Sequence, residues 1–133
     1  MTSTTNDHYQ LGIDTLTTVG GTTSAEMLDS IRAVSPKAAE HVVSAVFGEL
    51  YQGDDLSLRD RELASIASLA SLGGCEPQLR VHVSAALNVG VTAEEVVETF
   101  VQLIPFAGMP RALNALFVAH DVLTEHESGS HSG

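Results

Sequence analysis

Two adjacent glycines, Gly73 and Gly74, separate two helical patterns near the middle of the chain. Before them, the run from Leu63 to Leu72 is apolar around most of a helix, which is typical of a buried helix. After them, the segment Cys75-Glu76-Pro77 can open a second helix, because proline is favoured in a first turn. A joint this short makes the two helices antiparallel neighbours or nearly so, and this constrains every fold open to the chain.

Apolar residues recur at helical three- and four-residue steps through the rest of the chain, and no strand-like alternation competes with them. Thr92 is suited to cap a helix, and the sequence Thr-Ala-Glu-Glu at residues 92–95 has the pattern of a capping box. The expected helices cover about residues 9–19, 24–34, 36–51, 57–72, 75–88, 92–104 and 111–123. The sequence therefore predicts an all-α fold, a compact bundle of about six to seven helices.

The length and composition favour a single folded domain. A chain of 133 residues with 44% hydrophobic content can bury one core of moderate size. We expect this helical domain to cover residues 9–123. The polar ends, residues 1–8 and 124–133, are expected to be disordered tails.

The charge and the cysteine count exclude several kinds of partner and site. A net charge of −11, with six Lys and Arg, argues against nucleic acid and against a membrane as partners. With one cysteine and no HxxxH, HExxH or CxxC spacing, no metal and no other cofactor are expected. The amino terminus lacks the features of a signal peptide, and no apolar run approaches the roughly 20 residues that span a bilayer. The cytoplasm is therefore the expected location.

Glu62 and His82 are the residues best suited to acid–base chemistry. Antiparallel helices joined at Gly73 and Gly74 can bring the start of the first helix to face His82 on the second. A carboxylate in that place can fix the tautomer of the imidazole. A structural explanation stands beside this one, because acids are favoured in a first helical turn and lone helical histidines are more often structural.

Further residues of the same two helices are candidates for contacting a substrate. Arg59 and Arg61 can either hold an anion or be solvated partners of neighbouring acids. Cys75, Gln78 and His82 occupy positions i, i+3 and i+7, which form one stripe along a helix. Cys75 is either a reactive thiol at a helix start or a packing residue.

The sequences RDRELASIASLASLG, at residues 59–73, and QLRVHVSAALNVGVTAEEVVETFVQLIPFAGMP, at residues 78–110, resemble the carboxymuconolactone decarboxylase family. They are also similar to the related alkylhydroperoxidase-D group, and the resemblance extends over about residues 9–123. It implies an alkylhydroperoxidase-D-like all-α fold. It also implies self-assembly, commonly into homotrimers or homohexamers.

The chain departs from these relatives at three places. The peroxidase branch uses a CxxC pair followed by a histidine four residues later; Cys75 and His82 match, but Gln78 stands at the second cysteine. Without a second thiol, the intramolecular disulfide cycle of that branch cannot run. Glu62 falls one residue out of step with that branch's glutamate. Phe106 stands where the decarboxylases often have the tyrosine of Y-x-G-x-P, so a phenol that can bind substrate is missing.

We therefore expect a cofactor-independent decarboxylase of the 4-carboxymuconolactone type, or a relative acting on another enolisable carboxylated small molecule. His82 is the expected general acid/base, and Glu62 the residue that orients it. The expected substrate contacts are Arg59, Arg61, Cys75, Gln78 and Phe106. Two alternatives stay open: peroxidase-like activity of Cys75 alone, and a helical oligomer that binds a small molecule without turning it over.

Overall fold

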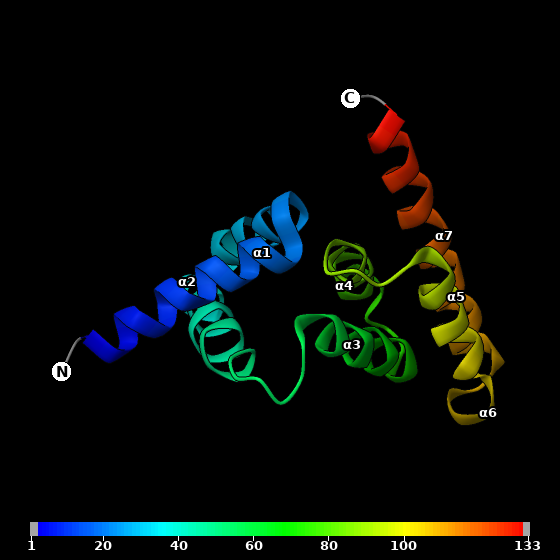
Figure 1. The fold of residues 1–133 in the computed structure, drawn as a ribbon, viewed down its shortest axis with the longest axis horizontal. Coiled ribbons are helices and arrows are strands. Elements are labelled where there is room, and N and C mark those ends of the chain that lie inside the picture. Colours follow the sequence, from blue (N-terminus) through cyan, green and yellow to red (C-terminus); the bar gives the residue numbers. More distant parts are fainter. Residues whose placement is uncertain (1–2, 132–133) are drawn as a thin grey trace. The chain divides into compact units, whose positions relative to one another are not determined.

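The computed structural model describes residues 3–131; residues 1–2 and 132–133, which belong to the expected tails, lie outside the described residues. Every regular element in that span is helical, which confirms the all-α class. The elements, drawn in Figure 1, are α1 (Ser3–Val34), α2 (Pro36–His41), the π-helix η1 (Val42–Leu50), α3 (Leu58–Leu72), α4 (Glu76–Asn88), α5 (Ala93–Gln102), α6 (Ile104–Ala107) and α7 (Met109–His131).

Glycine and capping residues set most of the helix boundaries. Gly21 has φ 54° and ψ −139°, so it breaks α1 at the stop that the sequence predicts. Ser35 caps α2, since its hydroxyl accepts the amide hydrogen of Ala38 at 3.1 Å. Thr92 and Glu95 form the predicted capping box at the start of α5. These expected boundaries are confirmed.

The chain ends are more helical than the expectation of disordered tails. α1 begins at Ser3, and α7 runs from Met109 to His131. The expected tails, residues 1–8 and 124–133, therefore overlap helices over much of their length. The domain bounds of 9 and 123 stay a prediction.

The chain divides into two compact units, residues 1–58 and residues 59–133. In Figure 1 the helices of unit 1 are coloured from blue to cyan-green, and those of unit 2 from green to red. No helix in residues 3–131 combines the length and the apolar character that a membrane crossing requires.

Unit 1 is held together by a close contact between the backbones of α1 and η1. A Cβ atom at Gly12 would lie 1.9 Å from the carbonyl oxygen of Val43, and one at Gly48 would lie 1.9 Å from the carbonyl oxygen of His8. Only glycine permits this approach. The buried residues of this unit's core are Leu16, Leu28, Ala39, Val43 and Phe47.

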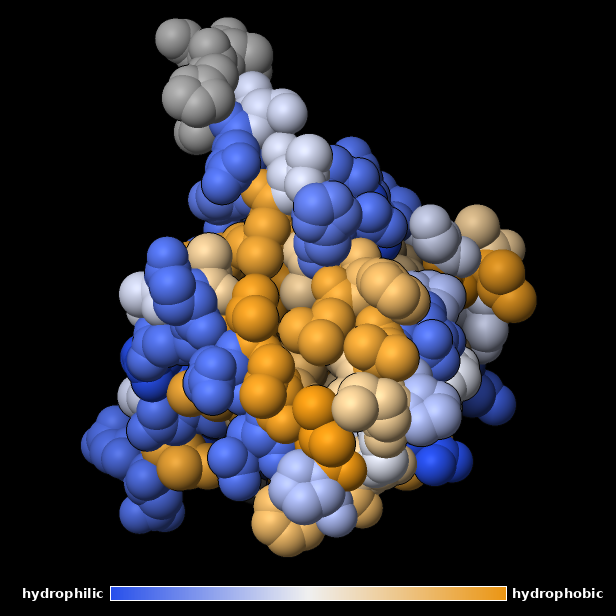
Figure 2. Space-filling model, turned by 90° about the vertical axis from the view of Figure 1, so that its right-hand side faces the viewer, coloured by the Kyte–Doolittle hydropathy of each residue, from blue (hydrophilic) through white to orange (hydrophobic). Residues whose placement is uncertain are grey.

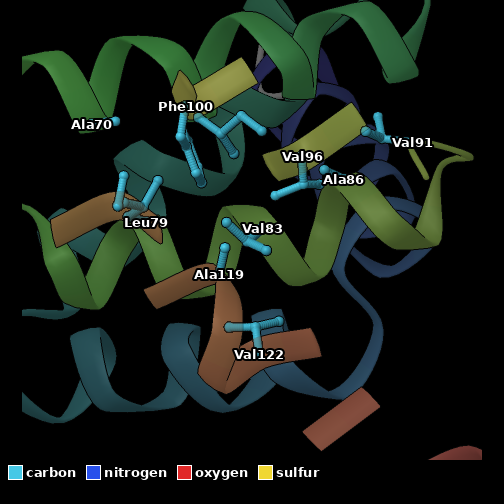
Figure 3. Close-up of a cluster of buried hydrophobic side chains, with 11 residues drawn as sticks. Ala70, Leu79, Val83, Ala86, Val91, Val96, Phe100, Ala119 and Val122 are labelled. Carbon is cyan, nitrogen blue, oxygen red and sulfur yellow. The ribbon is translucent and has the colours of Figure 1, made fainter. Parts of the chain in front are cut away.

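Unit 2 has a larger core, to which α3, α4, α5 and α7 all contribute. Figure 3 shows side chains from these helices pointing toward one another around Val83 and Phe100, both of which are fully buried. The buried residues are Ile66, Ala70, Leu79, Val83, Ala86, Val91, Val96, Phe100, Ala115, Ala119 and Val122. This core fixes α3 and α4, the helices that carry the predicted acid–base pair.

The glycine contact in unit 1 gives a first prediction. Gly48→Ala forces a methyl group against a backbone oxygen that cannot rotate away, so we expect a loss of about 1–3 kcal/mol in unfolding free energy. Urea unfolding followed by circular dichroism measures it. Gly129→Ala is the matched control, because Gly129 is a helical glycine with open space at its Cβ position. Equal stability of the two variants would show that the α1–η1 contact is not tight.

Candidate active site

The turn between α3 and α4 is built by two consecutive glycines. Gly73 and Gly74 have φ values of 73° and 74°, a region that side chains other than glycine rarely adopt. The amide of Gly73 donates to the carbonyl of Leu69 at 3.2 Å and closes α3, and Cys75 is the N-cap of α4. The short joint between the two helices is as predicted.

This turn brings Glu62 of α3 and His82 of α4 together. Nδ1 of His82 lies 2.7 Å from Oε2 of Glu62. The Glu62 side chain is 0% exposed, whereas that of His82 is 25% exposed. The carboxylate is therefore shut away from solvent, while the imidazole remains accessible. The predicted contact exists, and the catalytic role of the pair stays a prediction.

The contact with Glu62 distinguishes the two imidazole nitrogens. A carboxylate can only accept a hydrogen bond, so in the tautomer that pairs with an ionised Glu62 the hydrogen is on Nδ1 of His82. Nε2 is then a base when the ring is neutral and an acid when the ring is protonated. A partly exposed ring with one nitrogen fixed in this way can exchange a proton with a bound molecule.

Arg59 lies on α3 one turn before Glu62 and pairs with a residue far along the chain. Its Nη2 donates to Oε2 of Glu95, and its Nη1 lies 3.4 Å from Oδ1 of Asp60. The sequence predicts the Asp60 partner, but nothing in the 36-residue separation marks Glu95, which the sequence identifies only as part of a cap. The ion pair links the start of α3 to the start of α5.

The pKa values of this pair are shifted in the directions expected for an ion pair. The backbone amide of Thr92 and then the Arg59 guanidinium hold the pKa of Glu95 below its ordinary value. The hydrogen bond to Glu95 raises the pKa of Arg59. Both groups stay charged at neutral pH.

The other predicted contact residues are spread over unit 2. Arg61 is half-buried on α3, Gln78 is exposed on α4 one turn before His82, and Phe106 on α6 is 80% exposed. Cys75 is half-buried, and its thiol lies 3.5 Å from the carbonyl oxygen of Gly73. Their contact with a substrate stays a prediction.

Cys75 lines a shallow pocket that the sequence does not predict. Its other walls include Leu69, Leu79, Arg111 and Asn114. Nε of Arg111 donates to the carbonyl of Leu72 at 3.4 Å, at the end of α3. Among the described side chains, no group of three or more His, Cys, Asp or Glu is arranged to hold a metal ion.

Comparison with known proteins finds relatives over much of the chain. The profile of the Carboxymuconolactone decarboxylase family matches residues 36–121, which include both Glu62 and His82. A 4-carboxymuconolactone decarboxylase of Acinetobacter baylyi is 28% identical over 118 residues, covering 88% of this chain and 87% of that protein. An uncharacterized 15.0 kDa protein of Paracoccus denitrificans, from the nqo9–nqo10 intergenic region, is 35% identical over 82 residues, or 61% of each chain. This chain thus spans less than two thirds of the Paracoccus protein.

The Glu95 pair makes stability depend on pH in a defined direction. Because folding lowers the pKa of Glu95, the pair stabilises the fold above the ordinary value of 4.5 and loses this effect as the pH falls through the lowered value. Near neutral pH, we expect the melting temperature of Glu95→Gln to lie below that of the parent protein. The difference should shrink below about pH 4.5, as measured by thermal melts across pH.

Glu98→Gln is the charge-matched control for this experiment, since Glu98 lies exposed on the same helix. It should lower the melting temperature less than Glu95→Gln does. A difference between Glu95→Gln and the parent protein that stays constant through the acid range would contradict the assignment.

Proposed function

This chain belongs to the carboxymuconolactone decarboxylase family, and from that membership we propose that it is a cofactor-independent carboxy-lyase. The proposed substrate is 4-carboxymuconolactone or another enolisable carboxylated small molecule, in the cytoplasmic catabolism of aromatic compounds. The observation that carries the proposal is the pair of a buried Glu62 carboxylate and an accessible His82 imidazole, 2.7 Å apart. The Acinetobacter baylyi relative, named as a 4-carboxymuconolactone decarboxylase, supports the same reaction class.

The proposed reaction needs one proton donor and charge stabilisation. The bond between the substrate carbon and its carboxylate breaks, carbon dioxide leaves, and the electron pair remains as a dienolate conjugated with the lactone carbonyl. Nε2–H of the His82 imidazolium stabilises the developing oxyanion or protonates the carbon. Water then returns the proton to Nε2, so that the cycle consumes one proton for each carbon dioxide released.

Glu62 contributes by holding the ring through the whole cycle. Its hydrogen bond from Nδ1 is kept in both protonation states of His82, because Nδ1 carries hydrogen in each. Only Nε2 then changes its protonation state, and its direction stays fixed. Positioning of this kind lowers the barrier because the reacting groups are already aligned.

An arginine near the start of α3 is proposed to bind the carboxylate of the substrate, since a guanidinium matches a carboxylate with two parallel hydrogen bonds. Both Arg59 and Arg61 lie on this part of α3, and Arg61, which is half-buried there, is the one proposed to contact the substrate. Gln78, exposed one turn before His82, is proposed to add a neutral hydrogen bond.

His82→Ala tests the proposal most directly. We expect turnover of 4-carboxymuconolactone to fall about 100-fold or more, because the proton donor is lost. The measurement is the rate of lactone consumption, with circular dichroism to confirm the fold. His120→Ala, at an exposed histidine of α7, should keep full activity. Full turnover by a folded His82→Ala variant would remove His82 from the mechanism.

We also propose that the chain self-associates as a homotrimer or homohexamer, through an apolar face of unit 2. Figure 2 shows a band of apolar side chains on the side of the molecule that carries α5 to α7. On α7, Met109, Leu113 and Phe117 recur at four-residue steps and are 50%, 39% and 64% exposed. Phe106, on the neighbouring α6, is 80% exposed as well, and exposed apolar side chains that gather on one face are typical of an interface.

A charge placed on this face should separate the subunits. Phe117→Asp introduces a carboxylate that an apolar interface cannot solvate, so we expect a fall in mass from oligomer to monomer by analytical ultracentrifugation. Val34→Asp, at an exposed apolar residue of unit 1, is the control and should leave the mass unchanged. Dissociation by Val34→Asp alone would place the interface elsewhere.

A further inference from the structure

We propose that Arg59 is a positioning residue: its ion pair with Glu95 fixes the first turn of α3 and so holds Glu62 against His82. The inference rests on the proposed catalytic role of the Glu62–His82 pair. It assigns to Arg59 a function other than substrate binding.

The start of α3 needs such an anchor. Arg59 is the first residue of unit 2, and residues 52–57 before it form no helix. The first turn of a helix is held by fewer intrahelical backbone hydrogen bonds than its middle, and it frays most easily. Glu62 lies only one turn after Arg59, so a shift of that turn displaces the carboxylate that fixes the imidazole.

Glu95 is a rigid partner because both oxygens of its carboxylate are engaged. Its Oε1 accepts the amide hydrogen of Thr92 at 2.9 Å, and its own amide donates to the Thr92 hydroxyl at 3.1 Å. Its Oε2 faces Arg59. The next residue, Val96, is fully buried in the core of unit 2. Arg59 is thus tied to a part of α5 that cannot move independently.

α3 is fixed on both sides of Glu62 by different forces. One turn later, Ile66 is 0% exposed and packs in the apolar core. Ile66 restrains the helix through its burial, but an apolar contact has no preferred direction of its own. The ion pair of Arg59 adds a directed contact in the first turn, since a guanidinium binds a carboxylate in a defined plane.

Substrate binding by Arg59 is the competing explanation. A substrate carboxylate would have to compete with Glu95 and Asp60, both of which already approach the guanidinium. The two explanations differ in their effect on kinetics: loss of a substrate contact raises KM, whereas misalignment of the catalytic pair lowers kcat.

The test compares Arg59→Met and Glu95→Gln, each of which removes one side of the ion pair. Two readouts are used: nitrogen-15 NMR of the His82 ring in the absence of substrate, and kcat and KM with 4-carboxymuconolactone. We expect both variants to shift the ring signals toward an average of the two tautomers. We also expect both to lower kcat on the order of 10- to 100-fold, with little change in KM. Arg59→Lys should restore most of the activity, and the double variant should be no worse than the single ones.

The matched controls are Arg80→Met, which breaks the exposed Arg80–Glu125 pair, and Glu98→Gln on α5. Both should leave the His82 signals unchanged. Should Arg59→Met fail to fold, Glu95→Gln carries the test, because the amide is isosteric with the carboxylate.

Unchanged His82 signals in folded Arg59→Met and Glu95→Gln would overturn the inference. So would a raised KM with unchanged kcat in Arg59→Met alone, which would identify a substrate contact. If the parent protein does not turn over the lactone but both variants still shift the ring signals, the substrate assignment fails and the positioning role stands.

Discussion

The buried carboxylate of Glu62 is the constraint on which unit 2 depends. An ionised group removed from water costs several kcal/mol unless partners compensate it, and the His82 imidazole, 2.7 Å from the Glu62 carboxylate, is one such partner. Well-packed apolar residues of similar volume at these positions would often make the fold equally or more stable. A carboxylate retained at 0% exposure, beside a ring at 25% exposure, supports the proposed chemical role of the pair.

The rest of unit 2 holds the Glu62 carboxylate and the His82 imidazole next to each other. The left-handed pair Gly73 and Gly74 reverses the chain so that α4 returns beside α3. Ile66 and Val83, four residues from Glu62 and one from His82, are fully buried and lock the two helices into a common core. A local rule, the permissive backbone of glycine, thus fixes a contact between residues twenty positions apart.

Much of this could be predicted from the sequence because it follows from local chemistry. Helical periodicity, the Gly73-Gly74 turn and the Thr92 capping box depend on residues a few positions apart, and all are confirmed. The Glu62–His82 contact could be predicted as well, since a two-residue turn leaves little freedom between the helices that it joins.

Contacts between distant elements could not be predicted in this way. The π-helical form of Val42–Leu50 has no signal in the sequence, and the approach of this helix to α1 depends on Gly12 and Gly48. The sequence gives no sign of the ion pair between Arg59 and Glu95 either, because the capping box already explains why a glutamate stands at position 95. The sequence predicts a last helix that ends at about residue 123, whereas α7 continues to His131, because the polar composition of residues 124–131 resembles that of a tail.

The geometry of α4 supports the proposal that activity rests on the imidazole rather than on the thiol. Cys75 and His82 share a stripe, but seven residues separate them, a rise of about 10 Å along the axis. The Cys75 thiol is engaged instead with the carbonyl of Gly73, 3.5 Å away. Gln78 lies one helical turn before His82 on the same face of α4. A thiol at that position could exchange a proton with the ring directly; an amide cannot, but it can donate a hydrogen bond to a carboxylated molecule bound beside Nε2.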